Sequence, residues 1–201
     1  MKLSITMISY EDYARSGKMS VAQFIDECAA LKVDAADILE YFWQDKEREV
    51  AEIPGLLKEK GLEIGAFCVG NNFVVSPEDW QRQVDYVQQG LVTAAKLGAK
   101  RLRIFGGSVK TPEGIKPQER MGLVIEGIRQ CIGAAEKNGI TLVLENHGGI
   151  PVSSDELLEI LEAVDSPFLK VNFDMGNFLS SVEEDPLKAA EKLYKYIDLI
   201  H

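Results

Sequence analysis

The sequence predicts an α/β fold of the (β/α)₈ type, a TIM barrel that is incomplete, with about seven of its strands present. Short apolar, β-rich runs alternate with segments of helical spacing, as in parallel β-α-β units. The glycine-rich fingerprints GxGxxG and GxxxxGK[ST], which mark nucleotide-binding open sheets, do not occur. Polar residues instead stand at the ends of several strands, at the rim where such a barrel carries its active site.

The apolar runs give the expected strands, and capping signals give the helices between them. The strands are expected at residues 3–8, 36–42, 62–69, 101–105, 141–145, 169–173 and 197–200. Ser20 is expected to cap a helix over 21–32, and Ser76 with Pro77 to open a long helix toward Leu97. Further helices are expected over 117–137, from the caps at 153–155 to residue 163, and from Asp185-Pro186 onward.

Glycines predict where several helices end. Gly61, Gly98 and Gly139 each follow a helical segment and lead directly into the next strand. Glycine accepts the left-handed conformation that stops a helix, so these positions mark the helix-to-strand turns. Without a linker or a shift in composition, we expect a single domain over residues 1–201. Because a complete barrel has about 250 residues, this domain is expected to be truncated and to lack the final βα unit.

Composition narrows the classes of partner. The chain has 201 residues, of which 46% are hydrophobic and 27% charged, as in ordinary globular proteins. Acidic residues outnumber basic ones 32 to 22, and the net charge of −10 disfavours nucleic acid and anionic membrane surfaces as partners. Cys28, Cys68 and Cys131 have no CxxC spacing and fit buried, reduced thiols in a cytoplasmic protein.

Three neighbouring strands end in residues that can hold a metal. Alternation along residues 141–147 turns Glu145 and His147 toward the barrel mouth, while Leu142 and Leu144 face the helices. Asp174 ends the next strand, and His201 ends the strand after it. An interior carboxylate is costly unless it is paired or bound to a cation. Two carboxylates and an imidazole suit Mn²⁺, Mg²⁺ or Co²⁺ and can accept Zn²⁺.

These motifs resemble a known family along the whole chain. The stretches LENHGG, FDMGNF, LGAKRLRIFGG and ADILEYF, and the Ile-His that begins an I-H-x-K-D-like strand, are similar to those of the xylose isomerase-like barrels. That superfamily includes sugar phosphate isomerases and epimerases, ketose 3-epimerases, hydroxypyruvate isomerase and inosose-processing enzymes. The resemblance implies a divalent metal, Mn²⁺ first, held by Glu145, Asp174 and His201, with a further Glu ligand beyond residue 201. It also implies that Glu145 is one of two catalytic acid/base groups and leaves a homo-oligomer open.

The implied reaction is isomerisation or epimerisation of a small sugar, polyol or related carbonyl compound through an enediolate. Glu40, Arg103, His147 and Asn177 are the candidate substrate-binding residues. Each has a structural alternative: Glu40 as a rim carboxylate, Arg103 as the ion-pair partner of Glu145 or Glu40, His147 bound to a loop carbonyl, and Asn177 as a turn cap.

Other functions of the same barrel remain open at this stage. An inosose-type dehydratase, a lyase, would share the metal ligands and expel a β-hydroxyl from the enediolate. An apurinic endonuclease would need several zinc-binding histidines, and this chain has two histidines and a net charge of −10. A barrel without catalytic activity is the remaining alternative.

Overall fold

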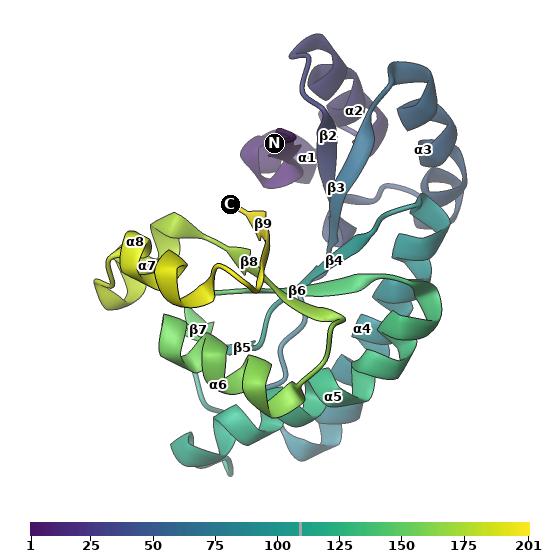
Figure 1. Cartoon of the computed structure of the whole chain (residues 1–201). Coiled ribbons are helices and arrows are strands. Elements are labelled where there is room, and N and C mark those ends of the chain that lie inside the picture. Colours follow the sequence, from purple (N-terminus) through teal and green to yellow (C-terminus); the bar gives the residue numbers. More distant parts are fainter. Residues whose placement is uncertain (109) are drawn as a thin grey trace.

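The computed structural model describes residues 1–108 and 110–201, which form a seven-stranded sheet in the order β1-β2-β3-β4-β6-β8-β9. All neighbouring strands of this sheet are parallel. Its strands are β1 (Ser4–Thr6), β2 (Ala35–Leu39), β3 (Glu63–Cys68), β4 (Arg101–Ile104), β6 (Thr141–Glu145), β8 (Leu169–Phe173) and β9 (Ile197–Ile200). The sheet curls with its helices outside, which confirms the predicted incomplete (β/α)₈ barrel (Figure 1).

Helices follow the strands along the chain. They are α1 (Glu11–Arg15), α2 (Val21–Ala30), α3 (Lys46–Lys60), α4 (Pro77–Leu97), α5 (Arg120–Asn138), α6 (Ser154–Val164), α7 (Met175–Val182) and α8 (Pro186–Leu193). Short 3-10 turns are η1 (Met7–Tyr10), η2 (Glu40–Phe42) and η3 (Pro117–Glu119). Helices α2 to α6 lie along the convex side of the sheet, and their apolar faces and that side of the strands form one continuous core.

The local signals act as predicted at most helix ends. Ser20 forms a capping box with Gln23 at the start of α2, and Ser153 forms one with Glu156 at the start of α6. The helix that opens at Pro77 ends at Leu97. The glycines that follow α3, α4 and α5 have φ angles of 68°, 79° and 64°, as a left-handed helix end requires.

Some expected bounds were wrong, and several elements were not expected. The strands expected at 3–8 and 36–42 end early, at Thr6 and Leu39, because the chain there turns into η1 and η2. Helix α7 begins directly after the sixth strand, β8, without a loop. Two short antiparallel strands, β5 (Gly107–Ser108) and β7 (Gly149–Ile150), join the loops after β4 and β6. Both strands of this pair lie in glycine-rich turns too short to show alternation.

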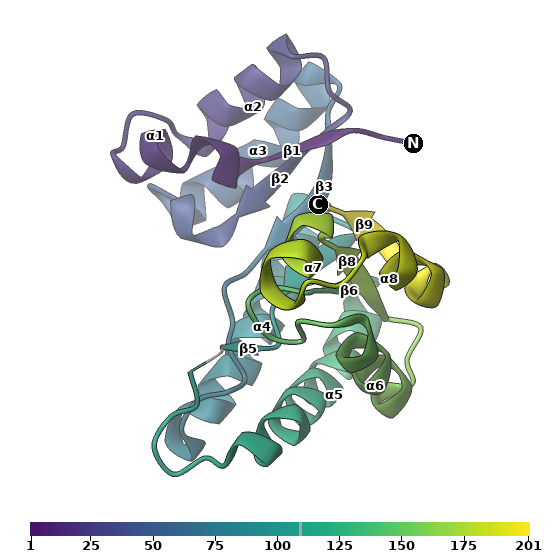
Figure 2. The ribbon, with the colours of Figure 1, turned by 90° about the vertical axis from the view of Figure 1, so that its left-hand side faces the viewer.

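The first and last strands form the two edges of the sheet. Among the described residues, β1 and β9 hydrogen-bond only to β2 and β8, respectively. Figure 2 shows both edges on the open side of the barrel, away from α4 and α5. The three cysteines are buried and unpaired, as expected. No helix among the described residues is long and apolar enough to cross a membrane.

Candidate metal centre

A cavity of about 520 Å³ lies at the carboxyl ends of the strands, on the open side of the barrel. Its wall includes β1 and β9, so it spans the gap between the two edge strands. The lining residues are Ser4, Ile5, Thr6, Ile8, Ser9, Asp37, Tyr41, Arg103, Phe105, Glu145, His147, Asp174, Ile200 and His201. All three predicted metal ligands therefore face one cavity, together with two of the predicted substrate-binding residues.

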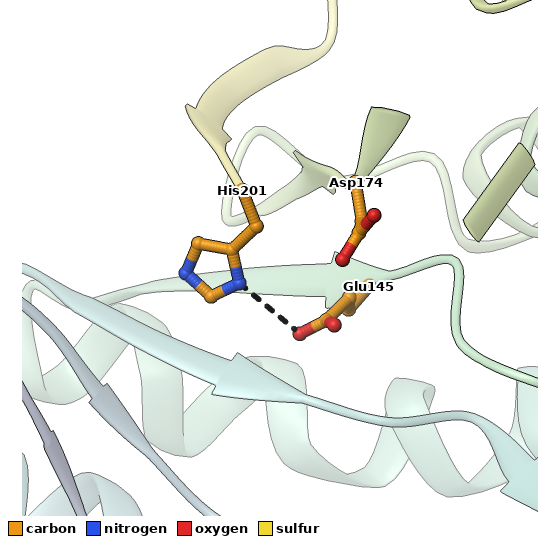
Figure 3. A group of neighbouring side chains, drawn as sticks. All are labelled: Glu145, Asp174 and His201. Atoms are coloured by element: carbon orange, nitrogen blue, oxygen red, sulfur yellow. Dashed lines mark ion pairs between the residues drawn. The ribbon is translucent and has the colours of Figure 1, made fainter. Parts of the chain in front are cut away.

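The three predicted ligands converge. Glu145 is the last residue of β6, Asp174 follows β8 and His201 follows β9, and their side chains point toward one another in Figure 3. One ligand atom from each lies within 4.8 Å of the others. Nδ1 of His201 is 3.6 Å from Oε2 of Glu145, which is a spacing that a shared cation can bridge. The backbone N–H of His201 donates to the carbonyl of Phe173 at 3.0 Å and fixes this chain end beside β8.

Asp174 is held by the start of α7. Its Oδ1 accepts the backbone N–H of Asn177 at 2.8 Å, so Asp174 is the N-cap of that helix. The buried amide of Asn146 pairs with the backbone N–H and carbonyl of Asp174, both at 2.9 Å. These bonds tie the end of β6 to the end of β8. The other oxygen of Asp174 makes none of these bonds and is available to a cation.

Glu145 lies between two cationic side chains. Nε of Arg103 is 3.1 Å from Oε2 of Glu145, and both side chains are almost completely buried. The guanidinium also donates to the carbonyl of Val69 at 3.0 Å and lies 4.0 Å from the centre of the Phe105 ring. Burial by itself raises the pKa of Glu145, but the contact with His201 and the charge of Arg103 outweigh it and lower that pKa below its ordinary value.

His201 lies between two carboxylates. Its Nε2 is 3.6 Å from Oδ2 of Asp37, on the opposite side of the ring from Glu145. Burial lowers the pKa of the imidazole, yet the interactions with Asp37 and Glu145 raise it to about 9. In the absence of a cation, a proton on His201 thus balances part of the surrounding negative charge.

This arrangement fits a divalent cation. The donor atoms are carboxylate oxygens and an imidazole nitrogen, which are the ligands that Mn²⁺, Mg²⁺, Co²⁺ and Zn²⁺ accept. They converge at the wall of a cavity, so water and substrate can complete the coordination. Asp37, Glu145 and Asp174 bring three formal negative charges, against one positive charge from Arg103. This excess of negative charge favours the binding of a cation.

The structure separates the four candidate substrate-binding residues into two groups. Arg103 and His147 line the cavity, and the exposed His147 ring lies 4.7 Å from the Phe105 ring. Arg103 also makes the ion pair with Glu145 that was its structural alternative. Glu40 and Asn177 are not among the lining residues. Glu40 pairs with Lys46, and the backbone of Asn177 is bound by Asp174 while its buried side-chain Nδ2 makes no hydrogen bond within the described residues.

Two residues of the site were missed by the sequence analysis. Asp37 is 1% exposed and lies at the centre of β2, in a run of five buried residues. A charge inside so apolar a strand was the signal that could have found it. Asn172 donates to Oε2 of Glu145 at 3.0 Å and lies two residues before Asp174. Strand alternation places those two residues on the same side of the sheet, so this one could also have been found.

Comparison with protein families supports the assignment made from the motifs. The family model described as "xylose isomerase-like TIM barrel" matches residues 25–201. The chain belongs to this family. As a xylose isomerase-like barrel, it has the strand order of the fold and the polar carboxyl-terminal rim on which such barrels build their sites. Comparison with curated protein sequences yields no match.

Solved structures with similar folds share little sequence with this xylose isomerase-like barrel. A D-tagatose 3-epimerase-like protein has a TM-score of 0.82 and 19% identity, with coverage of 100% of this chain and 75% of the other. The probable 3-DHS dehydratase AsbF of Bacillus anthracis has a TM-score of 0.78 and 23% identity, with 100% and 72% covered. A xylose isomerase domain protein from Planctomyces limnophilus has a TM-score of 0.73 and 20% identity, with 88% and 66% covered. The chain thus spans 66% to 75% of these structures.

Proposed function

We propose that this protein is a divalent-metal-dependent isomerase or epimerase of a small sugar, polyol or related carbonyl compound. One observation carries the proposal: Glu145, Asp174 and His201 meet at the wall of a single cavity at the carboxyl ends of three adjacent strands. The cavity volume of about 520 Å³ suits a small molecule. The fold similarity to a D-tagatose 3-epimerase-like protein agrees with this class of substrate.

Glu145 is the proposed proton acceptor. Its contacts with Arg103, Asn172 and His201 all use Oε2, and among the described residues none uses Oε1. Oε1 is therefore the atom that can take a proton from the carbon next to the substrate carbonyl. The contact with His201 and the charge of Arg103 lower the pKa of Glu145 and so favour the ionised carboxylate, which is the form that can accept the proton.

The other steps of the proposed reaction are stabilisation of the enediolate and return of the proton to it. A divalent ion held by Glu145, Asp174 and His201 would polarise the carbonyl and stabilise the negative charge that develops on its oxygen. The electron pair of the broken C–H bond forms the double bond of an enediolate. Return of the proton to the neighbouring carbon isomerises the substrate, and its return to the opposite face of the same carbon epimerises it. His147, exposed at the cavity wall, is proposed to hold a substrate hydroxyl.

A dehydratase is the second candidate. The structural similarity to the probable dehydratase AsbF favours it, and the same proton abstraction would begin that reaction. The two differ in what leaves: a dehydratase expels the β-hydroxyl as water, whereas an isomerase keeps every atom of the substrate. An apurinic endonuclease is disfavoured by the net charge of −10.

Solvent exchange tests the proposal across a range of candidate substrates. The protein with Mn²⁺ is incubated in D₂O with a panel of free ketoses, their phosphates and cyclic ketones, and the recovered compounds are analysed by mass spectrometry and NMR. We expect deuterium at the carbon next to the carbonyl, formation of an isomer or epimer, and loss of both in Glu145→Gln. Loss of water from a substrate would establish the dehydratase instead. Exchange that survives in Glu145→Gln or with EDTA would refute the proposed role of this site.

A further inference from the structure

Asp37 is a buried carboxylate that the proposed reaction does not use. It lies at the centre of β2, and its Oδ1 accepts the backbone N–H of Ala66 at 2.8 Å. Its Oδ2 accepts the hydroxyl of Ser4 at 3.1 Å. These bonds fix the plane of the carboxylate, and its Oδ2 lies 3.6 Å from Nε2 of His201. An ionised carboxylate in so dry a position needs such partners to be stable.

The neighbouring strand leaves room for this carboxylate. Gly65 of β3 lies against it, and a Cβ atom at that position would stand 2.2 Å from Oδ1 of Asp37. Real side chains do not approach that closely, so any larger residue would displace the carboxylate. Glycine at position 65 thus leaves the space that the carboxylate of Asp37 occupies.

Asn172 fixes which nitrogen of His201 carries a proton when the ring is neutral. An ionised Glu145 can only accept hydrogen bonds, so the atom of Asn172 that faces it at 3.0 Å must be the amide nitrogen. The same nitrogen lies 3.0 Å from Nδ1 of His201. Its second hydrogen therefore points at Nδ1, which must hold a lone pair. The proton of the neutral ring then belongs on Nε2, the nitrogen that faces Asp37.

Nε2 of His201 is buried and makes no hydrogen bond to any described residue. The 3.6 Å from Nε2 to Oδ2 of Asp37 exceeds hydrogen-bond length, so the proposed donation requires the imidazole to move closer to Asp37. The opposite nitrogen, Nδ1, is the one that faces Glu145 in Figure 3.

We propose that Asp37 is a positioning residue: it accepts the Nε2–H of His201 and so leaves the lone pair of Nδ1 on the side of Glu145 and Asp174, where a bound cation would replace the hydrogen of Asn172 as its partner. This inference rests on the metal site of the proposed function. Ligating histidines commonly donate their other N–H to a carboxylate, and loss of such a partner typically costs about 10- to 100-fold in metal affinity. Here the partner comes from β2, the neighbour of the edge strand β1, whereas His201 follows the other edge strand, β9.

The test is direct because the chain has only two histidines. Protein labelled with ¹⁵N-histidine is loaded with Zn²⁺, and long-range ¹H–¹⁵N spectra identify the tautomer of each ring, with His147→Gln to assign the signals. We expect His201 to carry its proton on Nε2 and to bind Zn²⁺ through Nδ1. A proton on Nδ1, or metal on Nε2, overturns the proposal in the wild-type protein alone, whatever the behaviour of any variant.

Asp37→Asn tests the energetic consequence. The Asn oxygen can still accept the N–H of Ala66, and its NH₂ group then faces Nε2, which reverses the preferred tautomer. We expect Mn²⁺ affinity by calorimetry to fall about 10- to 100-fold, with His201 shifted toward the Nδ1–H form. Asp34→Asn is the matched control, because it likewise removes one charge from a carboxylate that accepts a backbone N–H, that of Leu3 beside β1, but at an exposed position. Equal affinity in the two variants overturns the proposal.

These outcomes are separable from failure of the proposed function. Absence of Mn²⁺ and Zn²⁺ binding in the wild-type protein would refute the metal site itself and with it both proposals. Binding and turnover that persist unchanged in Asp37→Asn would refute the positioning role alone.

Discussion

The pKa of His201 gives a prediction about stability that needs no substrate. In the metal-free protein this pKa is raised to about 9, against 6.5 for an ordinary histidine. Since the folded-state pKa lies above the unfolded one, the stabilisation is fully present below about pH 6.5 and is lost as the pH rises through 9. A difference of this size corresponds to about 3 kcal/mol in all. Between pH 5.5 and pH 8 the loss comes to about 2 kcal/mol.

Urea unfolding in EDTA at several pH values measures this loss, and His201→Gln isolates it. The difference in unfolding free energy between wild-type protein and His201→Gln should shrink by about 2 kcal/mol from pH 5.5 to pH 8. His147→Gln is the matched control, because it removes the other of the two histidines, at an exposed position on the same cavity wall. The window ends at pH 8 because burial raises the pKa values of the three cysteine thiols, so their ionisation in the unfolded chain adds its own slope above that pH.

A specific result refutes the reasoning. If wild-type protein and His201→Gln change in parallel over this pH range, then the imidazolium is not stabilised between Asp37 and Glu145. The arrangement at the end of β9 would then differ from the one described. Addition of Mn²⁺ should weaken or reverse the pH dependence of the wild-type protein, since the cation competes with the proton for His201.

Three further predictions concern the same residues. Binding of Mn²⁺ at pH 7 should release about one proton, measured by calorimetry in buffers of different ionisation enthalpy, and no such release should occur in His201→Gln. Gly65→Ala should destabilise the fold by about 1–3 kcal/mol in urea, because its Cβ meets Asp37, whereas Gly55→Ala, in the open middle of α3, should stabilise it by about 0.5–1 kcal/mol. Arg103→Met should cost about 3–5 kcal/mol by leaving Glu145 buried without its partner, and a second change, Glu145→Met, should restore part of that loss.

Sequence patterns predicted the parts of the fold that depend on local chemistry. The strands at Thr141–Glu145, Leu169–Phe173 and Ile197–Ile200 were predicted residue for residue, since each is an apolar run with a sharp polar end. The ends of β1 and β2 were not, because the tight turns that follow them have the same apolar composition as the strands. Helix α7 was not predicted, because Asp174 was interpreted only as a metal ligand and not also as the N-cap of a helix.

The site was predictable to the extent that its residues end strands. Glu145, Asp174 and His201 were found in this way, and the structure brings them together. Glu40 and Asn177 also stand just beyond strand ends, yet Glu40 pairs with Lys46, and the backbone N–H of Asn177 is bound by Asp174, the cap of α7. Sequence patterns could not predict which side chains from distant strands lie close together. Asp37 lies mid-strand, and its proximity to His201 depends on the curl of the sheet that brings β2 opposite β9.

One electrostatic cause underlies both the raised pKa of His201 and the candidate metal site. Asp37, Glu145 and Asp174 carry three formal negative charges on one cavity wall, and Arg103 offsets one of them. Without a cation, a proton on His201 reduces the remaining excess. With a divalent cation and a neutral His201, the formal charges would cancel, and in the proposed function the same imidazole would be a ligand. The proton and the metal would then compete for one group, so the same carboxylates would govern both the pH dependence of stability and the affinity for the cation.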